Sequence, residues 1–272
     1  MQVSRPETPF GDDPVDEIAL ADSPLVAVVA QLRFPTIASI ARAEFVGPFQ
    51  EALRPHYPVL RQERAVGLLV TQAGVSATGD PGHVWRFHDR SHTWSVSLSS
   101  EFLSLDTTAY VDRADFLDRL GRVLGALAEC IEPATVDRFG LRYVDRIVLG
   151  GGEGLGELGD LVRPELRGLA TSPLGPGAEL THTVADAQFE LADCVLHARW
   201  GILPAGVQLD PLHGPPSDAP AWLLDLDMFT EKPTGFDVGT FRDLAACYAD
   251  RIYRFFRWSI EPGLIRRSGG LP

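Results

Sequence analysis

The chain has 272 residues, 45% of them hydrophobic and 22% charged, so it can bury a real core as one large domain or two small ones. Its net charge of −13 disfavours nonspecific binding to nucleic acid and to anionic membrane surfaces, because both would be repelled. No apolar run approaches the roughly 20 residues that span a bilayer, and the first residues lack the basic and apolar stretches of a secretory signal. We therefore expect a cytoplasmic bacterial protein without membrane association.

The first part of the chain is predicted to be mostly strands. Residues 1–22 are rich in proline and acidic residues and predict a flexible lead-in. Residues 25–34 are apolar on both faces, as in a central strand. A short helix over 39–53, with a possible break at Gly47-Pro48, is followed by strands with period-2 alternation at 65–76, 83–88, 93–98 and 102–107.

Two long amphipathic helices are the clearest elements. Asp112 is a natural N-cap for the first, which carries an apolar stripe at 3.6-residue spacing and stops at Pro133. Asp237 caps the second in the same way. Between them we predict strands at 136–149, 180–184, 188–200 and 222–229.

The chain repeats one pattern. Leu103–Asp106 precedes Asp112 and Phe116, and Leu224–Asp227 precedes Asp237 and Phe241; a strand containing Trp94 or Trp200 comes before each. Chance is the alternative, because a strand followed by a capped helix is common. We predict an α+β fold of two similar halves, each a run of antiparallel strands closed by a long amphipathic helix. The expected boundaries are a first half at 23–150, a linker at 151–177, a second half at 178–263 and a flexible tail at 264–272; whether the halves share one sheet stays open.

Several segments resemble a known family. They are Pro24-Leu25-Val26 with Gln31-Leu32-Arg33-Phe34-Pro35, Trp94–Leu98, Phe139–Ile147 and Leu224–Asp227. The chain resembles, over about residues 22–262, a sporadically distributed family of roughly 250-residue bacterial and archaeal proteins without a characterised function, and a shared fold does not by itself supply one. The resemblance implies one fold over this length and a cytoplasmic location. It carries no catalytic residues.

An arginine row is the best candidate site. Arg138, Arg142 and Arg146 are evenly spaced on one face of a predicted strand, and such a row can bind a phosphate, a carboxylate or an acidic peptide. Asp225 and Asp227 likewise share a strand face and are candidate acid–base or binding groups. The alternative, which we favour, is that the arginines pair with aspartates on neighbouring strands, Asp106 among them.

Other motifs point to no cofactor and no metal. Gly154–Gly159 fits G-x-G-x-x-G, but its acidic neighbours would repel a pyrophosphate and Pro164 interrupts the helix that should follow. Cys194 and His197 fall on opposite faces of one strand, which is wrong for a single metal ion. His83, His88 and His92 are expected at a surface hairpin. The three cysteines predict buried thiols in a reducing compartment, and no hydrolase, metalloprotease or P-loop signature is present.

We therefore predict a non-enzymatic binding or adaptor protein. Its expected partner is another protein, such as one encoded beside it in a defence or biosynthetic gene cluster. The alternative is an enzyme or small-molecule binder that uses the arginine row and the facing aspartates. The oligomeric state is not predicted.

Overall fold

In the computed structural model, residues 5–11, 15–65, 68–71, 74–77, 82–150 and 154–270 are described. The fold is α+β, with 33% helix and 31% strand, the strands forming a large antiparallel sheet. The chain divides into two compact units, each built from separate stretches. Unit 1 comprises Met1–Val28, Arg142–Met228 and Cys247–Pro272, and unit 2 comprises Val29–Leu141 and Phe229–Ala246. The sequence instead predicts contiguous halves at 23–150 and 178–263.

Three strands contribute to both units, namely β1 (Leu25–Arg33), β9 (Arg138–Val148) and β12 (Ala221–Thr230). In unit 2, β9 and β1 are followed in hydrogen-bonding order by β7 (Phe102–Thr107), β6 (Trp94–Leu98), β5 (Gly82–His88) and β2 (Val59–Ala65). In unit 1 the order is β10 (Thr183–Glu190), β11 (Val195–Leu203), β12, β9 and β1. The described residues also form two small two-stranded sheets, one of β3 (Leu68–Thr71) with β4 (Gly74–Ala77) and one of β8 (Thr135–Val136) with β13 (Thr234–Gly235).

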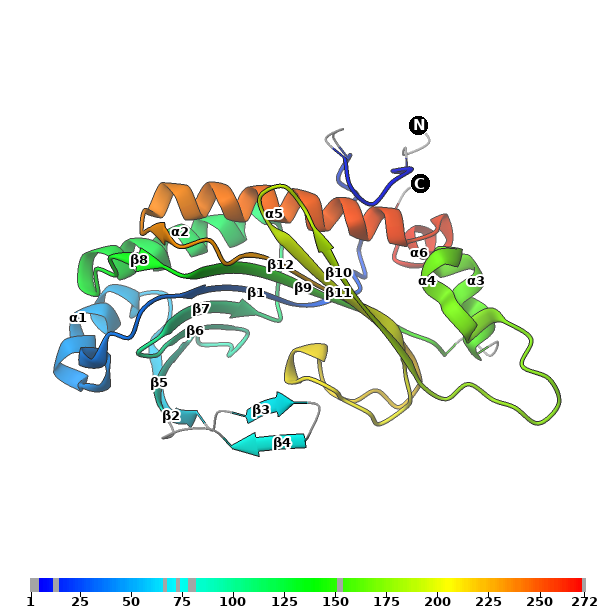
Figure 1. Ribbon diagram of the computed structural model, residues 1–272, viewed down its shortest axis with the longest axis horizontal. Helices are drawn as coiled ribbons and strands as arrows, with labels where there is room; N and C mark the ends of the chain where they lie inside the picture. Colours follow the sequence, from blue (N-terminus) through cyan, green and yellow to red (C-terminus); the bar gives the residue numbers. More distant parts are fainter. Residues whose placement is uncertain are drawn as a thin grey trace. The chain divides into compact units, whose positions relative to one another are not determined.

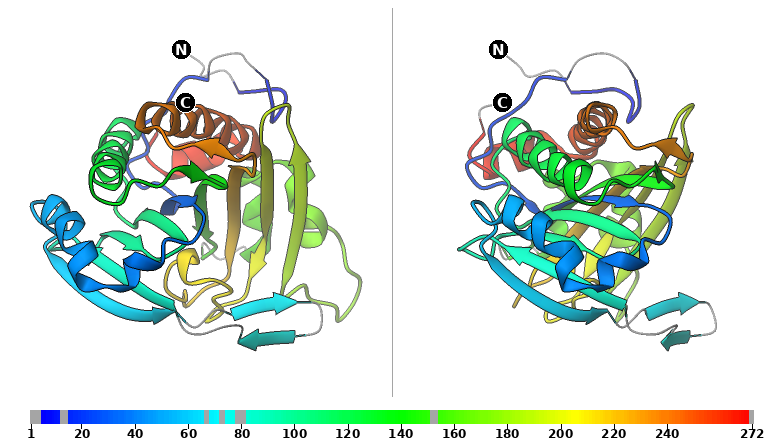
Figure 2. Two further views of the ribbon diagram at one scale, coloured as in Figure 1. Left: turned by 60° about the vertical axis from the view of Figure 1, so that its left-hand side comes forward. Right: turned by 90° about the vertical axis from the view of Figure 1, so that its left-hand side faces the viewer.

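In unit 2, helices cover one face of the strands (Figures 1 and 2). The predicted helix from Asp112 is α2 (Arg113–Cys130), and Asp112 Oδ1 accepts from Asp115 N at 2.8 Å, which confirms the cap. Phe116 of α2 packs 5.9 Å from the ring of Trp94, so the alternate side chains of β6 and β7 that point this way form the core. The first turns of α5 (Val238–Ser259) lie on the same side, where Phe241 packs 5.4 Å from Phe139.

Helix α1 (Ala43–Leu53), after the 3₁₀ turn η1 (Ala38–Ala41), packs beside α2. The sequence predicts a possible break at Gly47-Pro48, but the helix runs through Pro48. Its apolar face carries Val46, Phe49 and Leu53 into the core, and Phe49 meets Phe87 of β5 at 5.6 Å. The free energy gained by burying these side chains offsets the loss of the backbone hydrogen bond that Pro48 cannot donate.

In unit 1, the second half of α5 runs alongside the strands (Figure 2). Its Tyr248, Ile252 and Phe255 are buried, and the Phe255 ring lies 6.0 Å from that of Phe189 of β10. The described part of the segment predicted as a linker forms four short turns, and three of their leucines, Leu158, Leu161 and Leu166, are buried. These turns are η2 (Gly154–Glu157), α3 (Leu158–Leu161), α4 (Pro164–Arg167) and η3 (Gly168–Thr171). The glycine-rich sequence here has no apolar residues at helical spacing. The turns therefore depend on apolar contacts that form only in the folded chain.

The two ends of the chain also differ from expectation. The predicted tail contains α6 (Pro262–Arg267), with Leu264 and Ile265 buried. In the predicted lead-in, Arg5 forms an ion pair with Glu261 at 2.7 Å and Ile18 N donates to Tyr253 Oη at 2.8 Å. The described part of the lead-in is therefore attached to the C-terminal helices. Among the described residues, none of the helices combines the length and the apolarity needed to cross a membrane.

Candidate functional site

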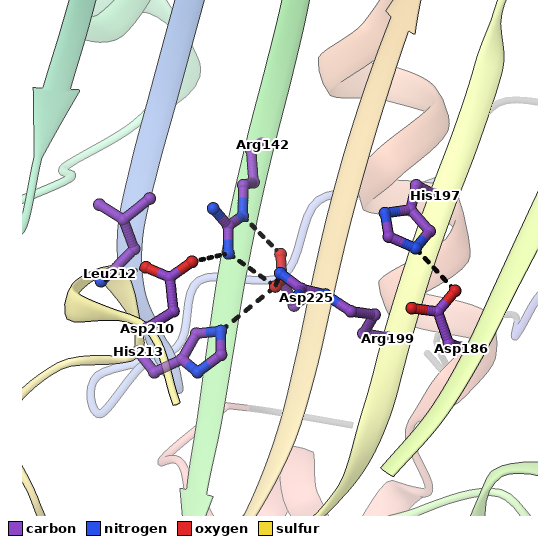
Figure 3. A network of polar contacts seen from close by, with 8 residues as sticks. All are labelled: Arg142, Asp186, His197, Arg199, Asp210, Leu212, His213 and Asp225. Carbon is purple, nitrogen blue, oxygen red and sulfur yellow. Dashed lines mark hydrogen bonds and ion pairs between the residues drawn. The ribbon is translucent and has the colours of Figure 1, made fainter. Parts of the chain in front are cut away.

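Arg142, in the unit 1 part of β9, forms a two-pronged ion pair with Asp225 of β12. Its Nε donates to Asp225 Oδ1 at 2.7 Å and its Nη2 to Asp225 Oδ2 at 2.8 Å (Figure 3). The same Nη2 donates to Asp210 Oδ2 at 2.9 Å. The parallel geometry matches the planar guanidinium to the carboxylate and strengthens both hydrogen bonds. The predicted pairing of the arginine row with aspartates is confirmed at this position.

Asp225 is the hub of a wider network. Besides Arg142, its Oδ2 accepts from Arg199 Nη2 of β11 at 2.6 Å and lies 3.2 Å from His213 Nε2. The Asp225 side chain is only 2% exposed. Burial alone would raise its pKa, but the hydrogen bonds from His213 and Arg142 and the charges of Arg142 and Arg199 hold the pKa well below its usual range. Asp225 is thus a buried carboxylate kept ionised by its neighbours.

The network holds down residues 204–220, which we call the clamped loop. Asp210 accepts from Leu212 N at 2.9 Å and so begins the 3₁₀ turn η4 (Pro211–His213). Leu212 packs on a small apolar cluster on the sheet, and His213 is 2% exposed. Arg146 Nη1 donates to two loop carbonyls, His213 O at 3.1 Å and Pro215 O. The apolar cluster consists of Ala27, Val144, Leu203 and Leu223.

The other two predicted site residues, Arg138 and Asp227, lie on the same two strands, β9 and β12. Arg138 belongs to unit 2, where its guanidinium carbon lies 4.3 Å over the ring of Phe229. Asp227 is half-buried on β12, two residues beyond Asp225. The predicted row of three arginines on β9 is therefore divided. Arg142 and Arg146 contact the clamped loop, whereas the Arg138 guanidinium lies over the ring of Phe229.

Sequence reasoning missed Asp210, His213 and Arg199. Asp210 precedes Pro211, and an aspartate followed by proline favours the start of a helical turn. The sequence therefore contained a signal for Asp210 as a cap. His213 and Arg199 had no comparable signal, because their link to Asp225 depends on how an irregular loop folds back over two strands. His213 Nδ1 is buried and has no hydrogen-bond partner among the described residues, so the imidazole is held through Nε2 alone.

A second polar row lies in unit 2, on the face opposite α2. His88, Ser95 and Asp106 stand directly across from one another on β5, β6 and β7. Ser95 Oγ donates to Asp106 Oδ2 at 2.7 Å, and burial raises the pKa of this carboxyl despite that hydrogen bond. In a hydrolytic triad the histidine stands between the hydroxyl and the carboxylate. Here the serine stands between them, so the row does not present an activated nucleophile.

Asp145 of β9 is a further buried acid, 4% exposed and on the opposite strand face from Arg142. Burial, and to a smaller extent the negative charge of Asp225, raise the pKa of Asp145 to about 8. Asp145 is therefore largely protonated at neutral pH, whereas Asp225 is ionised. Two acids of the same unit thus hold opposite protonation states.

The described residues contain no group of three or more histidine, cysteine or acidic side chains placed to hold a metal ion. No protein-family model matches the chain, and a search of curated proteins found no relative. The site must therefore be interpreted from its own geometry.

Proposed function

We propose that this protein is a binding or adaptor protein and that the clamped loop is its recognition element. The observation that carries the proposal is that two arginines, two aspartates and a histidine, Arg142, Arg146, Asp210, Asp225 and His213, all fix this one loop. Binding residues commonly lie on loops positioned by a rigid scaffold. A loop held in one conformation loses less entropy on binding than a mobile one.

The loop is also ordered internally and exposes aliphatic side chains. Gln208 Nε2 donates to Gly214 O at 2.7 Å, and Gly206 N donates to Ser217 O at 2.8 Å. Val207 and Leu209, on either side of Gln208, are 38% and 53% exposed. Exposed aliphatic groups on a fixed loop suit an apolar pocket on a partner protein. We propose a cytoplasmic protein partner, such as one encoded in the same defence or biosynthetic gene cluster.

The alternative, an enzyme or small-molecule binder based on the arginine row, receives less support. It requires guanidinium groups that are available to a ligand. Arg142 is 18% exposed and its Nε and Nη2 are paired with Asp225 and Asp210, while Arg146 binds loop carbonyls. A ligand phosphate or carboxylate would have to displace these partners.

We also propose that the chain arose by duplication. The hydrogen-bonding order runs β1, β7, β6, β5 in one series and β9, β12, β11, β10 in the other, so the second series begins at β9, within the half predicted at 23–150. Trp94 and Trp200 then fall on the corresponding strands β6 and β11, and each series is followed by a long helix capped by Asp112 or Asp237. The matching order supports the repeat beyond the few residues that are identical.

The proposal is tested by affinity purification of the full-length chain from its native host. The loop variant Val207→Ser/Leu209→Ser is compared with the wild type and with the control Leu169→Ser/Leu174→Ser, which changes two leucines that are 61% and 39% exposed elsewhere in unit 1. We expect a partner that the wild type and the control retain and the loop variant loses, with equal thermal stability of all three. Recovery of the protein alone at every salt concentration, or equal retention by the loop variant, would contradict the proposal.

A further inference from the structure

Strand β10 is the last strand of the described sheet in unit 1, with β11 on one side of it (Figure 2). At the turn that joins the two strands, Leu191 N donates to Cys194 O at 2.8 Å. Hydrogen-bonded and non-hydrogen-bonded pairs alternate along an antiparallel ladder, so this contact fixes the pattern for all of β10. The residues whose N–H and C=O groups point away from β11 are therefore Val184, Asp186, Gln188 and Glu190.

The outer edge of β10 is acidic. Within the described ranges, no other segment forms a backbone hydrogen bond with these four residues. Their side chains share one face of the strand and are all exposed. Asp186 Oδ1 lies 2.7 Å from His197 Nε2, yet the aspartate side chain is still 60% exposed (Figure 3). A strand added at this edge would therefore meet two carboxylates, those of Asp186 and Glu190, on one face.

The opposite face of β10 is apolar. Ala185, Ala187 and Phe189 are half-buried there, and the Phe189 ring lies 6.0 Å from that of Phe255 of α5. An added strand would cover more of these side chains with its own apolar groups, and this burial is favourable. The edge thus favours a segment with basic side chains on one face and apolar side chains on the other.

We propose that β10 binds an extended segment of a partner protein by strand addition, and that this segment alternates basic and apolar side chains. In strand addition the main-chain hydrogen bonds give affinity, and the alternate side chains give specificity. Basic groups opposite Asp186 and Glu190 form cross-strand pairs of opposite charge. This surface does not use the clamped loop, so the inference goes beyond the function proposed above and holds or fails independently of it.

A second copy of the chain fits this edge less well. If β10 paired with β10 of another copy, each strand would bring Asp186 and Glu190 onto the same face of a two-stranded ribbon, where like charges are destabilising. Charged side chains on an edge strand are a means by which proteins avoid such edge-to-edge pairing. The same carboxylates attract a basic segment.

The probe is a fluorescein-labelled peptide of sequence Lys-Val-Thr-Val-Lys-Val-Thr. Paired antiparallel to β10, it places its two lysines opposite Glu190 and Asp186 and its valines on the apolar face. We expect it to bind the full-length chain saturably in fluorescence anisotropy. The same peptide with glutamate in place of both lysines should not bind.

Two N-methylated forms of the probe test the main-chain hydrogen bonds. Methylation of the third and fifth residues removes N–H groups that point at β10, and it should weaken binding at least about tenfold. Methylation of the second and fourth residues, whose N–H groups point away from β10, should have a much smaller effect. Both forms have the same charge and mass, so the comparison separates strand pairing from a general attraction between a basic peptide and an acidic protein.

Variants of β10 test the same surface from the side of the protein. Gln188→Pro removes an N–H that points away from β11, a position where an edge strand tolerates proline. It should leave the melting temperature nearly unchanged and weaken probe binding at least about tenfold. Asp186→Lys/Glu190→Lys should lose the lysine probe and bind the glutamate peptide instead. The control Asp22→Lys/Glu179→Lys makes the same change of charge at two exposed positions elsewhere in unit 1 and should still prefer the lysine probe.

The proposal is overturned if the lysine probe shows no saturable binding below about 1 mM, if the two methylated forms bind equally well, or if Gln188→Pro binds the probe as tightly as the wild type. It is also overturned if the wild type is a dimer that Gln188→Pro dissociates, because a second copy would then occupy the edge. Val207→Ser/Leu209→Ser should bind the probe like the wild type, which keeps this outcome distinct from the test of the clamped loop.

Discussion

Arg142 and Asp225 face each other from neighbouring strands, β9 and β12, through two parallel hydrogen bonds of 2.7 and 2.8 Å. The arginine side chain is 18% exposed and the aspartate 2%, so the pair is screened little by water. Asp210 of the clamped loop shares the same guanidinium nitrogen. The pair therefore couples the stability of the sheet to the position of the loop.

Arg142→Ala is expected to lower the free energy of unfolding by about 3 kcal/mol, because it leaves Asp225 buried with only part of its compensation. Urea denaturation of the purified chain measures this loss. Arg142→Lys should recover part of it but lose the two-pronged geometry. The control is Arg242→Ala, which breaks a pair with Asp118 whose side chains are 51% and 56% exposed, and which should cost less than about 1 kcal/mol. Equal effects of Arg142→Ala and Arg242→Ala would contradict the role assigned to the network.

Asp145→Asn is expected to stabilise the protein in a pH-dependent way. Since the pKa of Asp145 is raised to about 8 in the folded state, the folded chain binds more protons than the unfolded chain between about pH 4 and pH 8. The wild type thus loses stability as pH rises through this window, and asparagine, which does not ionise, avoids the loss.

Denaturation of wild type and Asp145→Asn at pH 5 and pH 8 tests this expectation. The variant's advantage should grow with pH and exceed about 2 kcal/mol at pH 8, because each unit of pKa shift corresponds to about 1.4 kcal/mol. Asp225, whose pKa is lowered, acts in the opposite direction and only in acid, and it is present in both proteins. A difference between the two proteins that stays constant with pH would show that Asp145 is not protonated in the fold.

The sequence predicts those parts of the fold that local patterns determine. The long helices and their caps follow from Asp112 and Asp237 and from apolar stripes at helical spacing, and the Arg142–Asp225 pair follows from side chains of opposite charge on predicted strands. The clamp was not predictable, because Asp210 and His213 lie in a loop without a period and reach the sheet only through tertiary structure. For the same reason α6 was missed: Leu264 and Ile265 are too few to form a pattern, yet both are buried.

Asp112→Ala is expected to cost about 1 kcal/mol, because it removes the acceptor for the Asp115 N–H at the start of α2. Thermal or urea unfolding measures the change. Arg122→Ala, on the exposed side of the same helix, is the control and should have a much smaller effect. If Asp112→Ala leaves stability unchanged, the free N–H must be satisfied equally well by water, and the cap does not stabilise α2.

Two glycine-to-alanine changes are expected to act in opposite directions. At Gly201 of β11, where φ is +155°, an added Cβ would lie 2.0 Å from the carbonyl oxygen of Thr183, the residue before its β10 partner Val184. The two strands would have to separate, so Gly201→Ala should cost more than about 2 kcal/mol. At Gly125 of α2 an added Cβ meets nothing within 4 Å, and Gly125→Ala should raise stability by about 0.5–1 kcal/mol, because alanine loses less backbone entropy in a helix. Urea denaturation midpoints of the two variants, compared with the wild type, test both expectations. A Gly201→Ala protein as stable as the wild type would mean that β10 and β11 are not paired in this register.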